Sequence, residues 1–276
     1  MFKRSVVVGC IAVLALGGVA RVEAGWRVEP EHRVTGGLLV SSFLYEEPNL
    51  MEIGGPLLGL RFQYDYRGEA YFFQGNVSYE AGRLDYDGAL QDLHSGAIEP
   101  HRAKSNDSIL SLEARIGEYR NIDMGEVAGY VGVGYRYWDN ALRGAGGYRR
   151  ETHYVYLPLG FSYESYGDSW RFGGGAEYRF FVRGWNDSRL SDVRSDYEDV
   201  SFKLGGGMGT RLYLRAVRVL DGRDNRRLLI EPYFDYWDIE ESSVEDIVEA
   251  GHVIAQAVEP HNQTRQIGVA ISIDLF

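Results

Sequence analysis

Apolar and polar residues alternate strictly along the last segment of the chain. The apolar set is Ile267, Val269, Ile271, Ile273 and Leu275, and the set between them is Gln266, Gly268, Ala270, Ser272 and Asp274. Because successive side chains of a β-strand point to opposite faces, this segment has one apolar face and one polar face. That pattern is typical of a strand with lipid on one side and a polar lumen on the other.

The same two-residue period recurs along the whole chain in about ten segments of membrane-spanning length. They are residues 36–45, 57–66, 70–82, 108–119, 126–138, 152–163, 170–182, 200–214, 228–237 and 265–276. The polar face of 57–66 carries Arg61 and Asp65, which excludes a dry core on that side. A soluble β-sandwich would share the alternation. Tyr and Phe at both ends of the apolar faces instead match the aromatic girdles of a membrane barrel.

The connections between these segments alternate in length. Short connections lie at 67–68, 121–125 and 166–168, with a longer one at 216–226. Long polar segments lie between them at 46–56, 84–107, 139–151, 184–199 and 238–264. We therefore predict an all-β fold: a closed antiparallel transmembrane β-barrel of about ten strands, with eight or twelve as alternatives. Short turns would face the periplasm and long loops the outside.

The first 24 residues have the pattern of an export signal. Lys3 and Arg4 precede an apolar run, and Val22-Glu23-Ala24 offers small residues for cleavage after Ala24, with cleavage after Ala20 as the alternative. A lipoprotein signal at Cys10 fits less well because the apolar stretch before it is short. We expect residues 1–24 to be a signal peptide and residues 25–276 to be one barrel domain without cysteine.

Charge and hydropathy exclude two classes of protein. The chain carries 29 basic and 40 acidic residues; removing Lys3, Arg4, Arg21 and Glu23 leaves 26 and 39, a net charge of −13. So acidic a chain is not expected to bind nucleic acid. No segment after the signal approaches the ~20 consecutive apolar residues of a membrane helix, so membrane insertion requires a closed barrel. These patterns predict a location in the cell outer membrane.

Charged residues of both signs recur on the polar faces that we assign to the lumen. They are Arg61, Asp65, Glu80, Glu113, Arg115, Arg136, Arg171, Glu177, Arg179, Lys203, Arg211, Glu231 and Asp235. Interleaved charges can pair across a narrow interior and fill it together with water. The alternative is a narrow, weakly selective pore with a constriction made by the arginines.

The remaining motifs do not predict a catalytic or metal site. Glycine runs such as Gly173-Gly174-Gly175 lie inside strands, without the following helix that a nucleotide site needs. The acidic loops lack a calcium-loop spacing, and the histidines lack a zinc spacing. We expect no cofactor and no metal. In the last long segment, Ser243 and Asp246 have capping-box spacing, and Val244, Ile247 and Val248 share one helical face, which predicts a short amphipathic helix.

Four segments carry a resemblance to a known family. The final strand ending in Phe276, the Gly82–Gly88 strand exit, and the strands Gly134–Trp138 and Glu231–Asp238 resemble porin-like outer-membrane β-barrel proteins of Gram-negative bacteria. The resemblance implies contacts with outer-membrane lipid and lipopolysaccharide, insertion by the barrel assembly machinery, and a monomer. It implies a structural or porin-like role, with passive passage of ions or small solutes. One departure is that Asp274, Ser272 and Ala270 share the phase of Phe276.

The chain also resembles omptins, which are ten-stranded outer-membrane proteases. Asp85 and Asp87 lie at a matching strand exit, and Asp187 matches a second aspartate position, but Arg189 stands where the omptin histidine would follow. Without an imidazole, a general base with a near-neutral pKa is missing. We therefore expect no enzyme activity, with an omptin-like protease as the alternative. A surface ligand-binding protein or adhesin, acting through the long loops, is a further alternative.

Overall fold

The computed structural model describes residues 30–91, 96–220 and 226–276. The predicted signal peptide lies outside them. The strands are β1 (Glu31–Glu47), β2 (Met51–Arg67), β3 (Tyr71–Gln91), β4 (Ile98–Ile122), β5 (Gly125–Leu142), β6 (Arg149–Ser165), β7 (Trp170–Ser188), β8 (Val200–Lys203), β9 (Gly207–Val219), β10 (Arg227–Ile239), β11 (Glu245–Glu249), β12 (His252–Ala257) and β13 (Asn262–Asp274). A 3-10 turn, η1, covers Leu190–Asp192.

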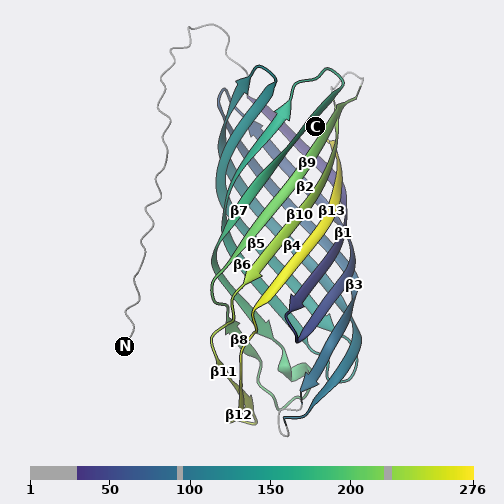
Figure 1. Ribbon diagram of the computed structural model, residues 1–276, viewed down its shortest axis with the longest axis vertical. Coiled ribbons are helices and arrows are strands. Elements are labelled where there is room, and N and C mark those ends of the chain that lie inside the picture. Colours follow the sequence, from purple (N-terminus) through teal and green to yellow (C-terminus); the bar gives the residue numbers. More distant parts are fainter. Residues whose placement is uncertain (1–29, 92–95, 221–225) are drawn as a thin grey trace, which may run out of the picture.

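Ten strands close into an antiparallel barrel (Figure 1). Each strand from β1 to β7 pairs with the next, β7 pairs with β9, and β9, β10 and β13 follow in order. Pairing of β13 with β1 closes the wall, from Thr35 opposite Asp274 to Glu46 opposite Gln263. The predicted closed barrel of ten strands is confirmed.

The outer surface of the barrel carries a belt of apolar side chains. On β2, Leu58 and Leu60 are 65% and 50% exposed, and on β13 the outward residues Ile267 and Ile271 are 63% and 50% exposed. Such a surface is unfavourable in water over so many strands but matches a hydrocarbon environment. In that environment only a closed sheet leaves no backbone group unpaired.

The final strand has the orientation that its pattern predicts. Gln266, Ala270, Ser272 and Asp274 are buried inside the barrel. β13 ends at Asp274, so Phe276 lies beyond the strand, where the alternation no longer determines its direction. It is 80% exposed, and its carbonyl oxygen accepts a hydrogen bond from the amide of Val34.

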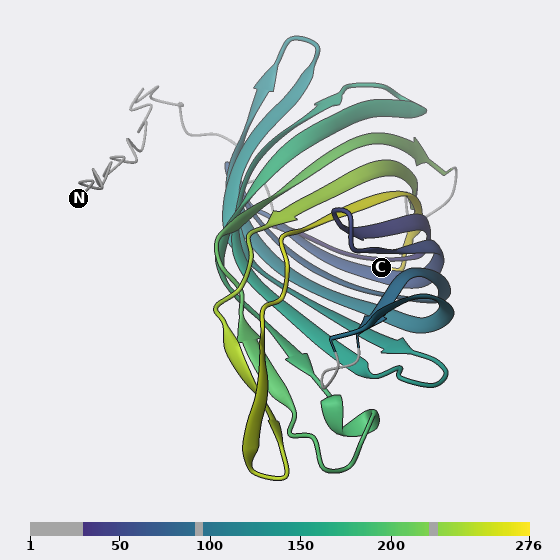
Figure 2. The same cartoon turned by 60° about the horizontal axis from the view of Figure 1, so that its bottom comes forward.

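The two ends of the barrel differ. Short turns connect β2 to β3, β4 to β5 and β6 to β7 at one end, where the chain also ends (Figure 1, top). At the opposite end lie β8, η1 and a separate hairpin of β11 and β12 (Figures 1 and 2). We call this opposite end the mouth.

Several predicted loops are extensions of strands. The segment 46–56 was expected to be a long loop, but β1 runs to Glu47 and β2 begins at Met51, which leaves a tight turn. Likewise, β3 runs to Gln91 and β4 begins at Ile98. Polar composition alone suggested loops here, because strands beyond the apolar belt expose one face to water and lose the lipid-facing pattern.

The predicted helix around Ser243 and Asp246 is wrong. Glu245–Glu249 and His252–Ala257 instead form the β11–β12 hairpin. The two residues between the strands, Ala250 and Gly251, have φ values of 48° and 80°. Positive φ at both positions suits a two-residue hairpin turn, and the β-branched residues beside it favour strands over a helix. Within the described ranges, no helix is long and apolar enough to cross a membrane.

An apolar core fills the interior toward the mouth. Its centre is Trp138 on β5, whose ring lies 5.4 Å from that of Phe43 and 4.8 Å from that of Tyr45, both on β1. All three side chains are almost completely buried. Aromatic packing of this kind fills the lumen with side chains and stabilises the wall that surrounds it.

Candidate functional site

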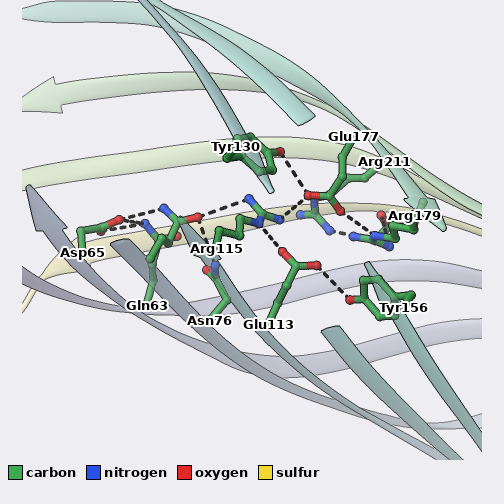
Figure 3. A network of polar contacts seen from close by, with 12 residues as sticks. Gln63, Asp65, Asn76, Glu113, Arg115, Tyr130, Tyr156, Glu177, Arg179 and Arg211 are labelled. Atoms are coloured by element: carbon green, nitrogen blue, oxygen red, sulfur yellow. Dashed lines mark hydrogen bonds and ion pairs between the residues drawn. The ribbon is translucent and has the colours of Figure 1, made fainter. Parts of the chain in front are cut away.

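Eleven charged side chains meet inside the barrel at the level of the apolar belt. We call them the lumen cluster: Arg61, Glu80, Glu113, Arg115, Arg136, Glu177, Arg179, Arg211, Arg215, Glu231 and Asp235. They point inward because the two-residue period of each strand places them opposite its lipid-facing residues. The long inward chains from facing walls can therefore reach one another, as Figure 3 shows for part of the cluster.

Glu177 on β7 binds two arginines in the middle of the lumen. Arg115 of β4 lies 2.8 Å from it (Nη2 to Oε2), and Arg179 of β7 lies 2.6 Å from it (Nε to Oε1). Its side chain is fully buried. β4 and β7 are separated in the wall by β5 and β6, so the Arg115–Glu177 pair crosses the interior (Figure 3).

Glu231 on β10 is a second crossing point. Its carboxylate lies 2.7 Å from Arg61 of β2, 2.7 Å from Arg215 of β9 and 3.2 Å from Arg211 of β9. Asp235 lies four residues further along β10, on the same inward face, and it joins the two halves, since Arg211 lies 2.8 Å and Arg179 3.1 Å from it. The ion pairs therefore run continuously from β2 through β10 and β9 to β7 and β4.

Tyrosines supply further hydrogen bonds to two of the carboxylates. Tyr156 donates its hydroxyl to Glu113 at 2.9 Å, and Tyr130 donates to Glu177 at 3.1 Å (Figure 3). Glu113 also pairs with Arg115. A buried ion pair stabilises a protein only when its other hydrogen-bonding groups are satisfied. These hydroxyls meet that condition without adding charge.

Glu80 is held differently from the other carboxylates. It accepts hydrogen bonds from Ser41 at 2.7 Å, from Gln266 at 2.8 Å and from Tyr233 at 3.4 Å. All of these donors are neutral. Glu80 thereby places a negative charge beside the arginines without a direct salt bridge. Its hydrogen bond from Gln266 also connects the final strand, β13, to β3, although β1 and β2 separate these strands in the wall.

Of three cavities along the interior, the smallest lies at the lumen cluster. The cavity among these side chains has a volume of about 70 Å³. A cavity of about 360 Å³ lies toward the end with the short turns, and one of about 540 Å³ lies at the mouth. The ion pairs therefore divide the lumen into two vestibules, separated by a region with room for only a few water-sized molecules.

Thirteen charged residues were expected in the lumen, and ten of them lie in the lumen cluster. Two others line the cavity near the short turns. Asp65 accepts hydrogen bonds from Gln63 and Gln74, and Arg171 lies 3.6 Å from Glu164 with its side chain 40% exposed. The sequence analysis did not assign Arg215 to the lumen because the predicted strand ended at residue 214. Arg215 lies four residues after Arg211 and therefore on the same inward face of β9.

Lys203, the remaining expected residue, lies on the outside of the barrel. It is exposed, while its neighbours Phe202 and Leu204 are each only 5% exposed and face inward. The reason is a break at residues 204–206, which belong to no strand and contain two glycines. The phase that places Arg211 in the lumen therefore does not extend back to Lys203.

A bulge in the neighbouring strand accompanies this break. Val155 pairs with Arg183 and Tyr156 pairs with Phe181, so Val182 of β7 has no partner on β6. An extra residue reverses the inward and outward positions that follow it. In both β7 and the β8–β9 segment, the positions that face inward therefore switch between odd and even residue numbers. β8 can remain paired with β7 on the mouth side of the apolar belt.

A second polar network lies near the mouth and was not expected from the sequence. Tyr45 donates its hydroxyl to Glu47 at 2.9 Å and to Glu259 at 3.2 Å, and Arg150 lies 3.1 Å from Glu47 and 3.5 Å from Glu259. Burial raises the pKa of Glu259 from 4.5 to about 7; the charge of Arg150 lowers it and that of Glu47 raises it. The sequence did contain one sign of this network: Arg150 lies on the same alternating face as Tyr154 and Tyr156, which predicts that it points inward.

The omptin-like positions lie on the outer side of the barrel wall. Asp85 and Asp87 lie on the outer face of β3, paired with Lys104 and Arg102 of β4. Asp187 lies 3.7 Å from His153, again outside the lumen, and that imidazole stacks on Trp185 at 4.4 Å. In the described part of the chain, no three His, Cys, Asp or Glu side chains are placed to hold a metal ion.

Neither a protein-family model nor a curated protein sequence matches this chain. Solved structures do match. The outer-membrane protease OmpT from Escherichia coli superposes with a TM-score of 0.60 at 10% identity, over 90% of this chain and 96% of OmpT. The fold is that of an outer-membrane β-barrel.

Two further similar structures are less close. The outer-membrane protein OprG from Pseudomonas aeruginosa has a TM-score of 0.36 at 11% identity, over 90% of this chain and 97% of OprG. An outer-membrane channel from Pseudomonas putida F1 has a TM-score of 0.39 at 10% identity, over 92% of this chain and all of the channel. At 10% identity, the similarity to OmpT identifies the fold and no particular activity.

Proposed function

We propose that this chain is a monomeric outer-membrane β-barrel protein with a closed lumen, which acts at the cell surface or structurally and does not form an open pore. The lumen cluster is the observation that carries the proposal. Its ion pairs connect strands that are not neighbours in the wall, and the cavity among these side chains is about 70 Å³. A porin would need a continuous aqueous path through this level.

The proposal includes an export signal at residues 1–24, insertion by the barrel assembly machinery, and contacts with lipid and lipopolysaccharide. The apolar belt supports the lipid contacts, because a soluble protein rarely exposes so continuous an apolar surface. Fractionation of cells that express the full chain, with detection in the outer membrane, tests the location. Recovery in the periplasm would contradict it.

Conductance in planar bilayers tests whether the lumen is closed. We expect the wild-type protein to give no steps or only small ohmic steps. The double variant Arg115→Ser with Glu177→Ser removes one positive and one negative side chain from the crossing pair, and we expect it to give larger steps. The matched control is Asp87→Ser with Arg102→Ser, which removes an ion pair on the outer face. Large steps from the wild type would overturn the proposal.

Binding of a small molecule at the mouth is a second candidate function. The mouth cavity, at about 540 Å³, falls in the usual range of ligand sites, roughly 300–1,000 Å³. Apolar residues such as Tyr86, Leu142 and Phe202 line much of it, with Glu47 and Arg150 as polar groups. A bound ligand should be lost on replacement of the mouth segments and kept in the Arg115→Ser, Glu177→Ser variant.

We do not propose a protease. Asp85 and Asp87 face outward, and the histidine near Asp187 belongs to an external aromatic cluster. A peptide-cleavage assay with the purified protein checks this, and we expect no turnover. Cleavage that disappears in Asp85→Ala or Asp87→Ala would favour the omptin-like alternative.

A further inference from the structure

Arg136 is the arginine of the lumen cluster that has no carboxylate partner within the described residues. It lies on β5 and is only 5% exposed, and both of its terminal nitrogens are buried without a hydrogen-bond acceptor. The other arginines of the cluster each lie within 3.2 Å of a carboxylate oxygen. A buried, unpaired guanidinium is costly, so this position requires an explanation.

Aromatic rings hold Arg136 but do not satisfy its donors. The guanidinium carbon lies 5.5 Å from the ring centre of Tyr154 and 6.0 Å from that of Phe43. Contact with a ring face stabilises the positive charge in part. The N–H groups, however, lie in the plane of the guanidinium and still need an acceptor at its edge.

Arg136 lines the 70 Å³ cavity at the centre of the lumen. Polar atoms surround this space, including Ser111 and Arg179, and Trp237 and Tyr156 close it on the apolar side. A cavity of this size holds more than one water-sized molecule. Arg136 therefore borders a space that a small ion can occupy.

The charges of the lumen cluster do not balance. Within the cluster, six arginines stand against five carboxylates, and the next carboxylate, Asp65, connects to its arginines only through the amides of Gln63 and Gln74. The cluster itself therefore has one positive charge in excess when all of its groups are ionised. Water can satisfy the hydrogen-bonding needs of Arg136, but it cannot neutralise this charge. A monovalent anion does both, and in a low-dielectric interior the neutralisation is the larger effect.

We propose that the lumen cluster binds one monovalent inorganic anion of the halide class beside the terminal nitrogens of Arg136. The anion accepts the two in-plane donors and completes the charge balance of the cluster. Arg136 then has the same role toward the anion that Arg61 has toward Glu231, with a diffusible ion in place of a side chain. This site is independent of the mouth cavity and of any ligand there.

Thermal unfolding in detergent micelles, followed by tryptophan fluorescence, tests the site in solution. Sodium chloride and sodium bromide are titrated against sodium gluconate at constant ionic strength. A ligand that binds only the folded state raises the unfolding temperature with its concentration. We expect a halide-dependent rise in the wild type and its loss in Arg136→Met, with Arg171→Met keeping it as the matched control. No halide dependence in the wild type would overturn the proposal.

Crystals of the full chain grown in sodium bromide provide the second measurement, which needs no variant. We expect an anomalous peak within hydrogen-bonding distance of the terminal nitrogens of Arg136. Water alone at that position would overturn the proposal even if the protein were stabilised by salt. A bromide peak without any stabilisation by halide in solution would mean binding at crystal concentration only, and it would also count against the proposal.

Discussion

Arg61 on β2 and Glu231 on β10 meet across the lumen, with 2.7 Å between Nη1 and Oε1. The two residues are 170 positions apart in the sequence, and β1 and β13 separate their strands in the wall. Their side chains are 13% and 6% exposed, so the pair is held away from bulk water. The pair therefore ties together the two strands that flank the seam between the ends of the chain.

Removal of the Glu231 carboxylate should destabilise the barrel strongly. Glu231→Gln leaves Arg61, Arg211 and Arg215 facing one another without their shared partner. Breaking a buried ion pair in this way typically costs about 3–5 kcal/mol in the free energy of unfolding. Denaturant unfolding in micelles measures the change. Asp85→Asn is the control, because that exposed pair contributes only about 0–1 kcal/mol.

Gly134 should tolerate no side chain. A Cβ atom there would collide with the ring of Tyr156, the residue that donates to Glu113. Overpacking of this kind costs about 1–3 kcal/mol, so Gly134→Ala should lower the free energy of unfolding by that amount. Gly129→Ala on the same strand is the matched control, since a Cβ atom there has open space. Equal stabilities of the two variants would contradict this account of the packing.

The mouth network should make stability depend on pH. Burial raises the pKa of Glu259 from 4.5 to about 7, so between these values the folded protein binds more protons than the unfolded chain. The free energy of unfolding should therefore fall as the pH rises from about 4.5 to about 7. Unfolding measured across this range in the wild type and in Glu259→Gln tests the effect. The variant should show a shallower decline, and an unchanged slope would assign the dependence to other groups.

The β11–β12 hairpin should be dispensable for folding. It forms a two-stranded sheet of its own, separate from the barrel sheet. It contacts the mouth through backbone hydrogen bonds such as those from Glu198 to Val248 and from Ala250 to Asp196. Replacement of residues 245–257 by a short Gly-Ser linker should leave β-sheet circular dichroism unchanged while removing any ligand bound at the mouth. Loss of the barrel signal would show that the hairpin supports the wall.

Local alternation was enough to assign the faces of most strands. On β13 it placed Asp274 inside, where it binds Arg33 at 2.9 Å and Arg227 at 3.0 Å, and it placed Ile267 and Ile271 outside. The prediction succeeds because the two-residue period depends only on strand geometry. It failed at Lys203, where a three-residue break changes the phase and no residue pattern on that strand reveals it.

The sequence of the hairpin at Glu245–Ala257 is compatible with two secondary structures. Its residues satisfy both a helical face and a strand pattern over a short stretch, and a short apolar segment cannot be assigned by periodicity alone. Pairing with a second strand decided the matter in the structure. Gly251 was the better signal in the sequence, because glycine readily adopts the positive φ that both Ala250 and Gly251 have in the turn.

By itself, the sequence determined the barrel, a strand number of about ten and the charged character of the lumen, because each follows from a period that neighbouring residues impose. Only the tertiary structure decided which charges meet, since the partners of Glu177 and Glu231 come from strands far apart in the chain. It also decided that Arg136 has no carboxylate partner among the described residues. The height of each side chain in the lumen depends on strand tilt and register, and these are set by the closure of the whole sheet.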